Sequence, residues 1–218
     1  MPELVRPPEP QACVLDLDGT LLDSLRDVAE SLNVCLEKLG LPTYPIDACR
    51  YMVGEGVPTL CQKAIGANCP ELVPRLIELM RVVYPTRATR HTRPYPGVLD
   101  LVARLKARGV RLGVLSNKPH ELTVRLVRSF WADGTFGAVY GYIAEEHRKP
   151  SPVYLRKICA ELGVAPAATW LVGDTPIDVA TALAAGAIPI GVTWGFRTRE
   201  ELAAAGAQWI FDRPEELG

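Results

Sequence analysis

The chain has 218 residues, of which 48% are hydrophobic and 22% are charged. This is the composition of a folded globular protein rather than a disordered one, and the length allows one large domain or a domain with a smaller insert. The 24 basic and 25 acidic residues nearly cancel, which excludes a strong overall field for nucleic acid or an anionic membrane surface. We therefore expect the partner to be a small molecule.

The N-terminal segment, Met1 to Gln11, contains four prolines and no apolar stretch. It therefore predicts neither a signal peptide nor a membrane span. Six cysteines are scattered along the chain without CxxC spacing, and buried free thiols are favoured over disulfides. They are Cys13, Cys35, Cys49, Cys61, Cys69 and Cys159. Both features favour a cytoplasmic location.

Four short apolar runs end abruptly at small or polar residues, as buried strands do where they continue into a loop. They cover residues 12–15, 110–115, 169–172 and 188–192. Segments of helical period lie between them, at residues 98–108, 121–130, 152–162 and 177–185. This alternation predicts an α/β fold: a Rossmann-like parallel sheet with helices on both faces and ligands beyond the carboxyl ends of its strands.

The region from residue 22 to residue 92 breaks the alternation. It offers helical stretches at 24–39, 56–65 and 71–84 with no convincing strand between them, and Asp23 or Ser24 is the expected N-cap of the first. We predict an inserted α-helical cap domain at 23–92 and an α/β catalytic core formed by 1–22 and 93–218. Hinges at 20–24 and 92–97 are expected to let the cap open and close.

Polar side chains at the strand ends offer what phosphoryl transfer needs: a nucleophile, donors to the phosphate oxygens, a proton-transfer group and ligands for a cation. Asp16 and Asp18 follow the first strand. Asp174 follows another and can complete an oxygen-rich magnesium shell, while Lys149 and Ser116 can donate to a phosphate.

Four motifs carry a resemblance to a known family. The segment Asp16-Leu17-Asp18-Gly19-Thr20-Leu21-Leu22-Asp23-Ser24 resembles the first signature of the haloacid dehalogenase-like hydrolase superfamily. Ser116-Asn117 resembles its second motif, Lys149-Pro150 its third and Gly173-Asp174-Thr175-Pro176-Ile177-Asp178 its fourth, all in the family's order. The opening motif and the long helical insert are most similar to the phosphoglycolate phosphatase-like branch.

The resemblance implies a Mg²⁺-dependent phosphatase acting on a small phosphorylated metabolite. Asp16 is implied to attack phosphorus and become an aspartyl phosphate, with Asp18 as general acid and base. Magnesium would be bound by the side chains of Asp16 and Asp174 and by the backbone carbonyl of Asp18. Asp178 is implied to act outside the coordination shell, on a metal-bound water or on Lys149.

The resemblance also implies which groups hold the phosphoryl group. They are the Ser116 hydroxyl, the Asn117 backbone N–H and the Lys149 ammonium, which also screens Asp16 from the incoming charge. Thr20 is expected to brace the loop through its hydroxyl, and Gly19 to permit its tight backbone path. Asp16, Asp18, Lys149 and Ser116 are thus the predicted catalytic residues.

Several alternatives stay open. Within the superfamily, Asp18 favours phosphate esters over dehalogenation or phosphonate cleavage, but a sugar-phosphate mutase would use the same two aspartates. Pyrophosphatase and nucleotidase activities also remain, because cap residues without a clear motif set specificity. A non-enzymatic binding protein would be expected to have lost at least one key residue of the site. The stretch 54–60 fits a loop that closes over the site and the start of a helix equally well, and no oligomeric state is predicted.

Overall fold

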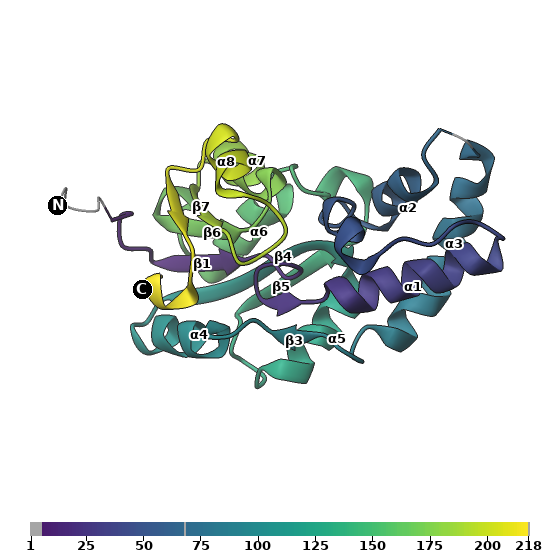
Figure 1. Cartoon of the computed structure of the whole chain (residues 1–218). Coiled ribbons are helices and arrows are strands. Elements are labelled where there is room, and N and C mark those ends of the chain that lie inside the picture. Colours follow the sequence, from purple (N-terminus) through teal and green to yellow (C-terminus); the bar gives the residue numbers. More distant parts are fainter. Residues whose placement is uncertain (1–5, 68, 218) are drawn as a thin grey trace.

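The computed structural model describes residues 6–67 and 69–217, so part of the N-terminal segment 1–11, for which neither a signal peptide nor a membrane span is predicted, lies outside the described residues. Its centre is a six-stranded parallel sheet with the strand order β5-β4-β1-β6-β7-β8 (Figure 1). The strands are β1 (Ala12–Leu15), β4 (Arg111–Pro119), β5 (Ala138–Tyr142), β6 (Thr169–Gly173), β7 (Ile188–Val192) and β8 (Trp209–Phe211).

Helices cover both faces of the sheet, as the alternation of strands and helices predicts. The α-helices of this part are α4 (Val98–Ala107), α5 (His120–Phe130), α6 (Val153–Leu162), α7 (Pro176–Ala185) and α8 (Arg199–Ala204). Short 3₁₀ turns follow at η3 (Glu145–His147), η4 (Pro166–Ala168) and η5 (Pro214–Glu216). Successive side chains of a strand point to opposite faces. Accordingly, Val14 shares a buried cluster with α6 and α7, and Leu15 shares another with α4 and α5.

The strand order places β1 between β4 and β6. From β4 the chain adds β5 on one side, and it then crosses back to build β6, β7 and β8 on the other side of β1. Ligands of such sheets bind beyond the carboxyl ends of the strands where this order reverses. Asp16, Ser116 and Asp174 therefore meet at one edge of the sheet, as the sequence predicts.

Two strands of the six-stranded sheet, β5 and β8, are not predicted from the sequence, and β4 is longer than predicted. β5 is an edge strand whose side chains are only partly buried, and β8 has three residues, so neither gives a clear apolar pattern. β4 continues through Ser116 to Pro119 instead of ending at Leu115. Its pairing with β5 is irregular over this stretch, because the register shifts between Leu115 and Pro119.

The insertion between β1 and α4 is mainly helical and lies beyond the carboxyl ends of β1 and β4 (Figure 1). It contains α1 (Leu25–Lys38), η1 (Ile46–Tyr51), α2 (Val57–Ile65), η2 (Pro70–Leu72) and α3 (Val73–Arg87). Two short strands at its base, β2 (Leu22–Asp23) and β3 (Arg93–Pro94), pair antiparallel. The two predicted hinges therefore run side by side, and the division into domains at residues 22 and 92 stays a prediction.

The cysteines agree with the predicted free thiols. All six are unbridged, five of them are buried, and Cys69 is half-buried. Within residues 6–67 and 69–217, no helix has both the length and the apolar character needed to cross a membrane.

Candidate active site

The loop after β1 brings Asp16 to the centre of the sheet edge. Its backbone N–H donates to the carbonyl of Val172 in β6 at 2.9 Å, and its side chain is buried. Gly19 has a φ of +91°, and a Cβ at this position would lie 2.3 Å from the Asp174 carboxylate. Only glycine permits this backbone conformation and this close approach, which is the tight path predicted for Gly19.

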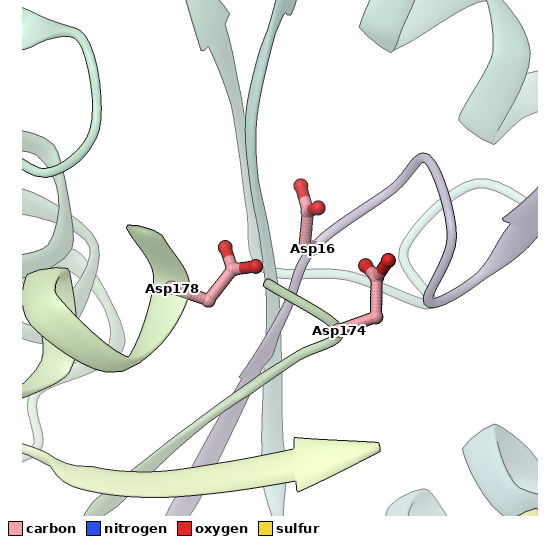
Figure 2. A group of neighbouring side chains, drawn as sticks. All are labelled: Asp16, Asp174 and Asp178. Carbon is pink, nitrogen blue, oxygen red and sulfur yellow. The ribbon is translucent and has the colours of Figure 1, made fainter. Parts of the chain in front are cut away.

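Three buried carboxylates converge at this edge: Asp16 after β1, Asp174 after β6 and Asp178 in the first turn of α7 (Figure 2). One oxygen from each lies within 4.8 Å of the others. We call these three residues the acidic cluster. Asp178 also caps its helix, because one of its oxygens accepts from the Thr175 hydroxyl at 2.6 Å and the Thr175 N–H at 3.1 Å.

Lys149 neutralises part of the acidic cluster. Its Nζ lies 2.8 Å from Asp16 Oδ1 and 2.6 Å from Asp178 Oδ1, and it is almost fully buried. The side chain of Asn117 fixes the Lys149 backbone: Lys149 N–H donates to Asn117 Oδ1 at 2.8 Å, and Asn117 Nδ2 donates to the Lys149 carbonyl at 3.2 Å. Asn117 thus holds the lysine with its amide, and the phosphate contact of its backbone N–H stays a prediction.

The acidic cluster carries more negative charge than Lys149 can balance. Burial raises the pKa of Asp16 well above its usual value; Lys149 opposes this, and Asp178 and Asp174 add to it. Burial, aided by Asp178, raises the pKa of Asp174 to about 7. For Lys149, burial alone lowers the pKa, but Asp16 and Asp178 outweigh it and raise the pKa overall. Three carboxylates beside one ammonium favour an additional cation.

The donor atoms fit a hard divalent cation. The cluster presents carboxylate oxygens, the ligands that Mg²⁺ and Ca²⁺ prefer. Within the described residues, buried Asp16 Oδ1 has no aligned hydrogen-bond donor, although it is paired with Lys149. Thr20 Oγ1 and the Phe196 N–H orient Asp174 by donating to its two oxygens at 2.9 Å and 2.8 Å. The acidic cluster can therefore hold a metal ion, with Thr20 supporting one of its ligands.

Asp18 lies in a different environment. Both of its oxygens accept from Lys118 Nζ at 2.7 Å, and Oδ1 also accepts from Ser24 Oγ at 2.5 Å. Lys118 Nζ donates as well to the hydroxyl of Tyr84, in α3 of the insertion, at 2.5 Å. We call Asp18, Ser24, Tyr84 and Lys118 the Lys118 cluster. Ser24 occupies the N-cap position of α1 without a side-chain capping bond, so its hydroxyl serves Asp18 rather than the helix.

The sequence interpretation missed Lys118 and Tyr84. Lys118 directly follows Ser116-Asn117, and a lysine at the end of a buried strand is unusual unless it has a partner. Tyr84 continues the buried positions Leu76 and Met80 at a spacing of four residues, which marks one face of a helix. Burial by itself lowers the pKa of Lys118, but Asp18 and Tyr84 outweigh it, and burial raises the pKa of Tyr84 to about 12.

A cavity of about 40 Å³ lies between the strand ends and the insertion. Strand-end residues line one side of it: Asp16, Asp18, Ser116, Asn117, Lys118 and Pro119. Residues of the insertion line the other: Val28, Val53, Gly54, Gly56, Val57, Leu60, Met80 and Tyr84. Gly56 is also the N-cap of α2, so the stretch 54–60 both begins a helix and borders the site.

A second cavity of about 450 Å³ shares Tyr84, Gly56 and Asn117 with the first.

Side chains of the α/β part donate to carbonyls of the stretch 54–60 and of the residues just before it. Asn117 Nδ2 donates to Gly54 at 3.3 Å, and Arg148 donates to Glu55 at 3.1 Å. Arg197 donates to the carbonyls of Arg50 and Val53. The Arg50 and Lys63 side chains bond elsewhere, to the Gly195 carbonyl and to Glu55.

Comparison with known proteins assigns the family. The family model for haloacid dehalogenase-like hydrolases matches residues 13–192. The chain belongs to the haloacid dehalogenase-like hydrolases. This confirms the resemblance carried by the four motifs, and the chain is an enzyme of the hydrolase class.

Individual members of this hydrolase family match over nearly their whole length. A phosphoglycolate phosphatase of Rhodospirillum rubrum is 35% identical over 217 residues, covering 96% of this chain and 90% of the relative. One from Aquifex aeolicus is 33% identical over 94% of this chain and 93% of its own. The crystal structure of a predicted phosphoglycolate phosphatase from Haemophilus somnus superposes with a TM-score of 0.86 at 28% identity, covering 94% and 95% of the two chains. The α/β fold is thus shared with solved members of the family.

Proposed function

We propose that this hydrolase is a Mg²⁺-dependent phosphatase that cleaves a small phosphate monoester such as phosphoglycolate through an aspartyl phosphate at Asp16. The observation that carries the proposal is the buried Asp16 carboxylate, which lines a cavity and is paired with Lys149 beside two further carboxylates. The names of the relatives support phosphoglycolate as substrate, and the free thiols agree with a cytoplasmic enzyme.

The acidic cluster would hold the metal. Asp16 and Asp174 would be ligands together with the backbone carbonyl of Asp18, and Asp178 would keep Lys149 in position through their ion pair. A bound Mg²⁺ supplies positive charge that offsets the charge of the phosphate. Lys149 and Ser116 would donate to the phosphoryl oxygens from the other strand ends.

The chemistry proceeds in two displacements at phosphorus. An Asp16 oxygen forms a bond to phosphorus as the ester P–O bond breaks, and Asp18 gives its proton to the leaving alkoxide. Water then attacks the aspartyl phosphate while Asp18 takes a proton from it, which releases phosphate and restores Asp16. Asp18 can serve both steps because it lines the same cavity as Asp16.

Hydrolysis of para-nitrophenyl phosphate with and without Mg²⁺ tests this proposal. We expect activity that a chelator abolishes, and a loss of roughly ten-thousand-fold or more in Asp16→Asn, as for other nucleophile substitutions. Asp23→Asn is the matched control, because Asp23 is an exposed acid of the same segment. Activity of Asp16→Asn at the wild-type level, or wild-type activity without any metal, would overturn the proposal.

The preferred substrate and the product distinguish the proposed reaction from pyrophosphatase, nucleotidase and mutase activity. We expect phosphoglycolate to be cleaved in preference to pyrophosphate and nucleoside monophosphates. With a hexose 1-phosphate, release of inorganic phosphate indicates a phosphatase, whereas the isomeric sugar phosphate would indicate a mutase.

A further inference from the structure

We infer that Lys118 and Tyr84 bind a carboxylate in the leaving group of the substrate and thereby determine which phosphate esters are cleaved efficiently. This rests on the proposed phosphatase function and adds the residues that recognise the leaving group of such a substrate, a short phosphate ester with a carboxylate close to the ester oxygen. The two residues come from different parts of the fold, Lys118 from the end of β4 and Tyr84 from α3 of the insertion.

The position of Asp18 places the leaving group beside Lys118. A general acid must contact the ester oxygen that it protonates. Lys118 Nζ lies 2.7 Å from both Asp18 oxygens, so a leaving group in contact with Asp18 extends into the surroundings of Lys118. Lys149 is held by Asp16 and Asp178 and lies with the group that is transferred.

The cavity lining has a cation beside the two carboxylates, Asp16 and Asp18, that act on the phosphorus and on the ester oxygen. Of the described residues that line the 40 Å³ cavity, Lys118 is the one with a positive charge. Much of the remaining lining toward the insertion is apolar, including Val28, Leu60 and Met80. A carboxylate enclosed by such side chains is stable only beside a cation that donates hydrogen bonds to it.

Tyr84 supplies a second donor. An ammonium group can only donate, so the Tyr84 oxygen accepts the bond from Lys118 and its own proton is left for an acceptor in the cavity. Tyr84 is buried and lines that cavity. The Lys118 ammonium and the Tyr84 hydroxyl therefore present two neighbouring donors, which suits the two oxygens of a carboxylate.

Binding of the carboxylate leaves Asp18 supported. The ammonium now donates to both Asp18 oxygens, and Ser24 donates to one of them. The substrate carboxylate takes over one of the Lys118 bonds, while Ser24 keeps Asp18 in its orientation. The Asp18 oxygen that Ser24 does not contact is then free to face the ester oxygen.

The test compares two esters of similar size, phosphoglycolate and 2-hydroxyethyl phosphate, whose leaving group carries no charge. We expect wild type to prefer phosphoglycolate in kcat/KM. A hydrogen bond to a charged group is worth roughly a ten- to hundred-fold change. Lys118→Met should reduce kcat/KM for phosphoglycolate by about this factor more than for the neutral ester, and Lys118→Arg should keep part of the preference.

Tyr84→Phe removes one hydroxyl and keeps the packing of α3. It should raise the KM for phosphoglycolate about tenfold and leave the neutral ester much less affected. Inhibition by glycolate should weaken in parallel, and this readout needs no turnover of a carboxylate ester. Lys106→Met, an exposed lysine of α4, is the control.

If Lys118→Met and Tyr84→Phe each reduced kcat/KM equally for both esters, the inference would be overturned, because the two residues would then act only through Asp18. Equal wild-type kcat/KM for the two esters would overturn it as well, even if Lys118→Met does not fold. That result leaves the proposed phosphatase intact, whereas hydrolysis of neither ester with Mg²⁺ would refute both.

Discussion

Two buried lysines lie at the carboxyl edge of the sheet, and their surroundings differ in charge. Lys149 lies between Asp16 and Asp178, with Asp174 close by, so that three carboxylates surround one ammonium. Lys118 lies between Asp18 and the neutral Tyr84, so that one carboxylate faces one ammonium. The acidic cluster needs a further cation, whereas the Lys118 cluster is balanced by its own residues.

The two clusters also differ in where their residues come from. The four residues of and around the acidic cluster all belong to the α/β part of the chain: Asp16 follows β1, Asp174 follows β6, Asp178 lies in the first turn of α7, and Lys149 lies in the segment before α6. The Lys118 cluster includes Tyr84 from the insertion. We therefore expect metal and pH to change the stability of the protein through the acidic cluster. The charge of the leaving group should change kcat/KM through the Lys118 cluster.

The largest effect that we expect is the loss of stability when either buried lysine is replaced. Removing one partner of a buried ion pair costs about 3–5 kcal/mol, so Lys149→Gln and Lys118→Gln should both lower the free energy of unfolding by about this amount without metal. Mg²⁺ should narrow the gap to wild type in Lys149→Gln, because it neutralises the same carboxylates. It should leave the gap of Lys118→Gln largely unchanged, because the metal stabilises that variant and wild type alike. Urea unfolding at pH 8 with chelator or with Mg²⁺ measures this.

The exposed Lys157 provides the control for both lysine variants. Lys157→Gln should change the free energy of unfolding by no more than about 1 kcal/mol, because it removes only an exposed contact of the ammonium with the Tyr140 ring. If Mg²⁺ brought both buried-lysine variants equally close to wild type in free energy of unfolding, this would contradict the assignment of the metal to the acidic cluster alone.

The next effect is a dependence of the free energy of unfolding on pH, which arises in the acidic cluster. The pKa of Asp174 is raised to about 7 in the folded state, against about 3.9 in an unfolded chain. The folded state therefore holds the proton more tightly. This stabilisation is complete below pH 4 and is lost as the pH rises through 7, by about 1.4 kcal/mol per pH unit between pH 5 and pH 7.

Urea unfolding of the metal-free protein from pH 5 to pH 8 measures this loss. Asp174→Asn should reduce the slope and leave the part that comes from Asp16, whose pKa is also raised, and Lys118→Gln should leave the whole dependence in place. Because Mg²⁺ binds the ionised carboxylates, its stabilising effect should grow over the same range. A metal-free protein whose stability rises from pH 5 to pH 7 would contradict the raised pKa of Asp174.

The smallest effect concerns Gly19. Alanine at a positive φ costs about 1–2 kcal/mol, and this cost should be similar in Gly19→Ala and Gly109→Ala, whose φ values are +91° and +77°. An added Cβ contacts Asp174 at Gly19, whereas at Gly109 it meets no atom within 4 Å. Only Gly19→Ala should therefore weaken Mg²⁺ binding, by roughly ten- to hundred-fold in calorimetric titration. Equal metal affinity in both variants would show that Asp174 is not a ligand.

The sequence predicts the acidic cluster better than the Lys118 cluster, for a physical reason. Asp16 and Asp174 directly follow apolar strands, and parallel strands bring their carboxyl ends together, so that pattern alone predicts their proximity. The Lys118 cluster depends on how α3 packs against the end of β4, and local periodicity says nothing about that contact. Ser24 illustrates the same limit, because its position predicts a helix cap whereas its hydroxyl bonds to Asp18.

The fold follows the same division. Central strands that are buried on both faces, such as β1 and β6, stand out as apolar runs. The edge strand β5 is half-exposed, and β8 is too short to show a period. These two strands are recognised by their pairing with β4 and β7, which the local sequence pattern does not show.

The central claim is that Asp16 carries the phosphoryl group during turnover. Its most direct test is to quench the enzyme during turnover of phosphoglycolate with Mg²⁺, to reduce it with borohydride and to locate the modified residue by peptide mass spectrometry. Reduction of an aspartyl phosphate gives homoserine, and we predict homoserine at position 16. Modification at another residue, or none at position 16 while turnover continues, would contradict the account.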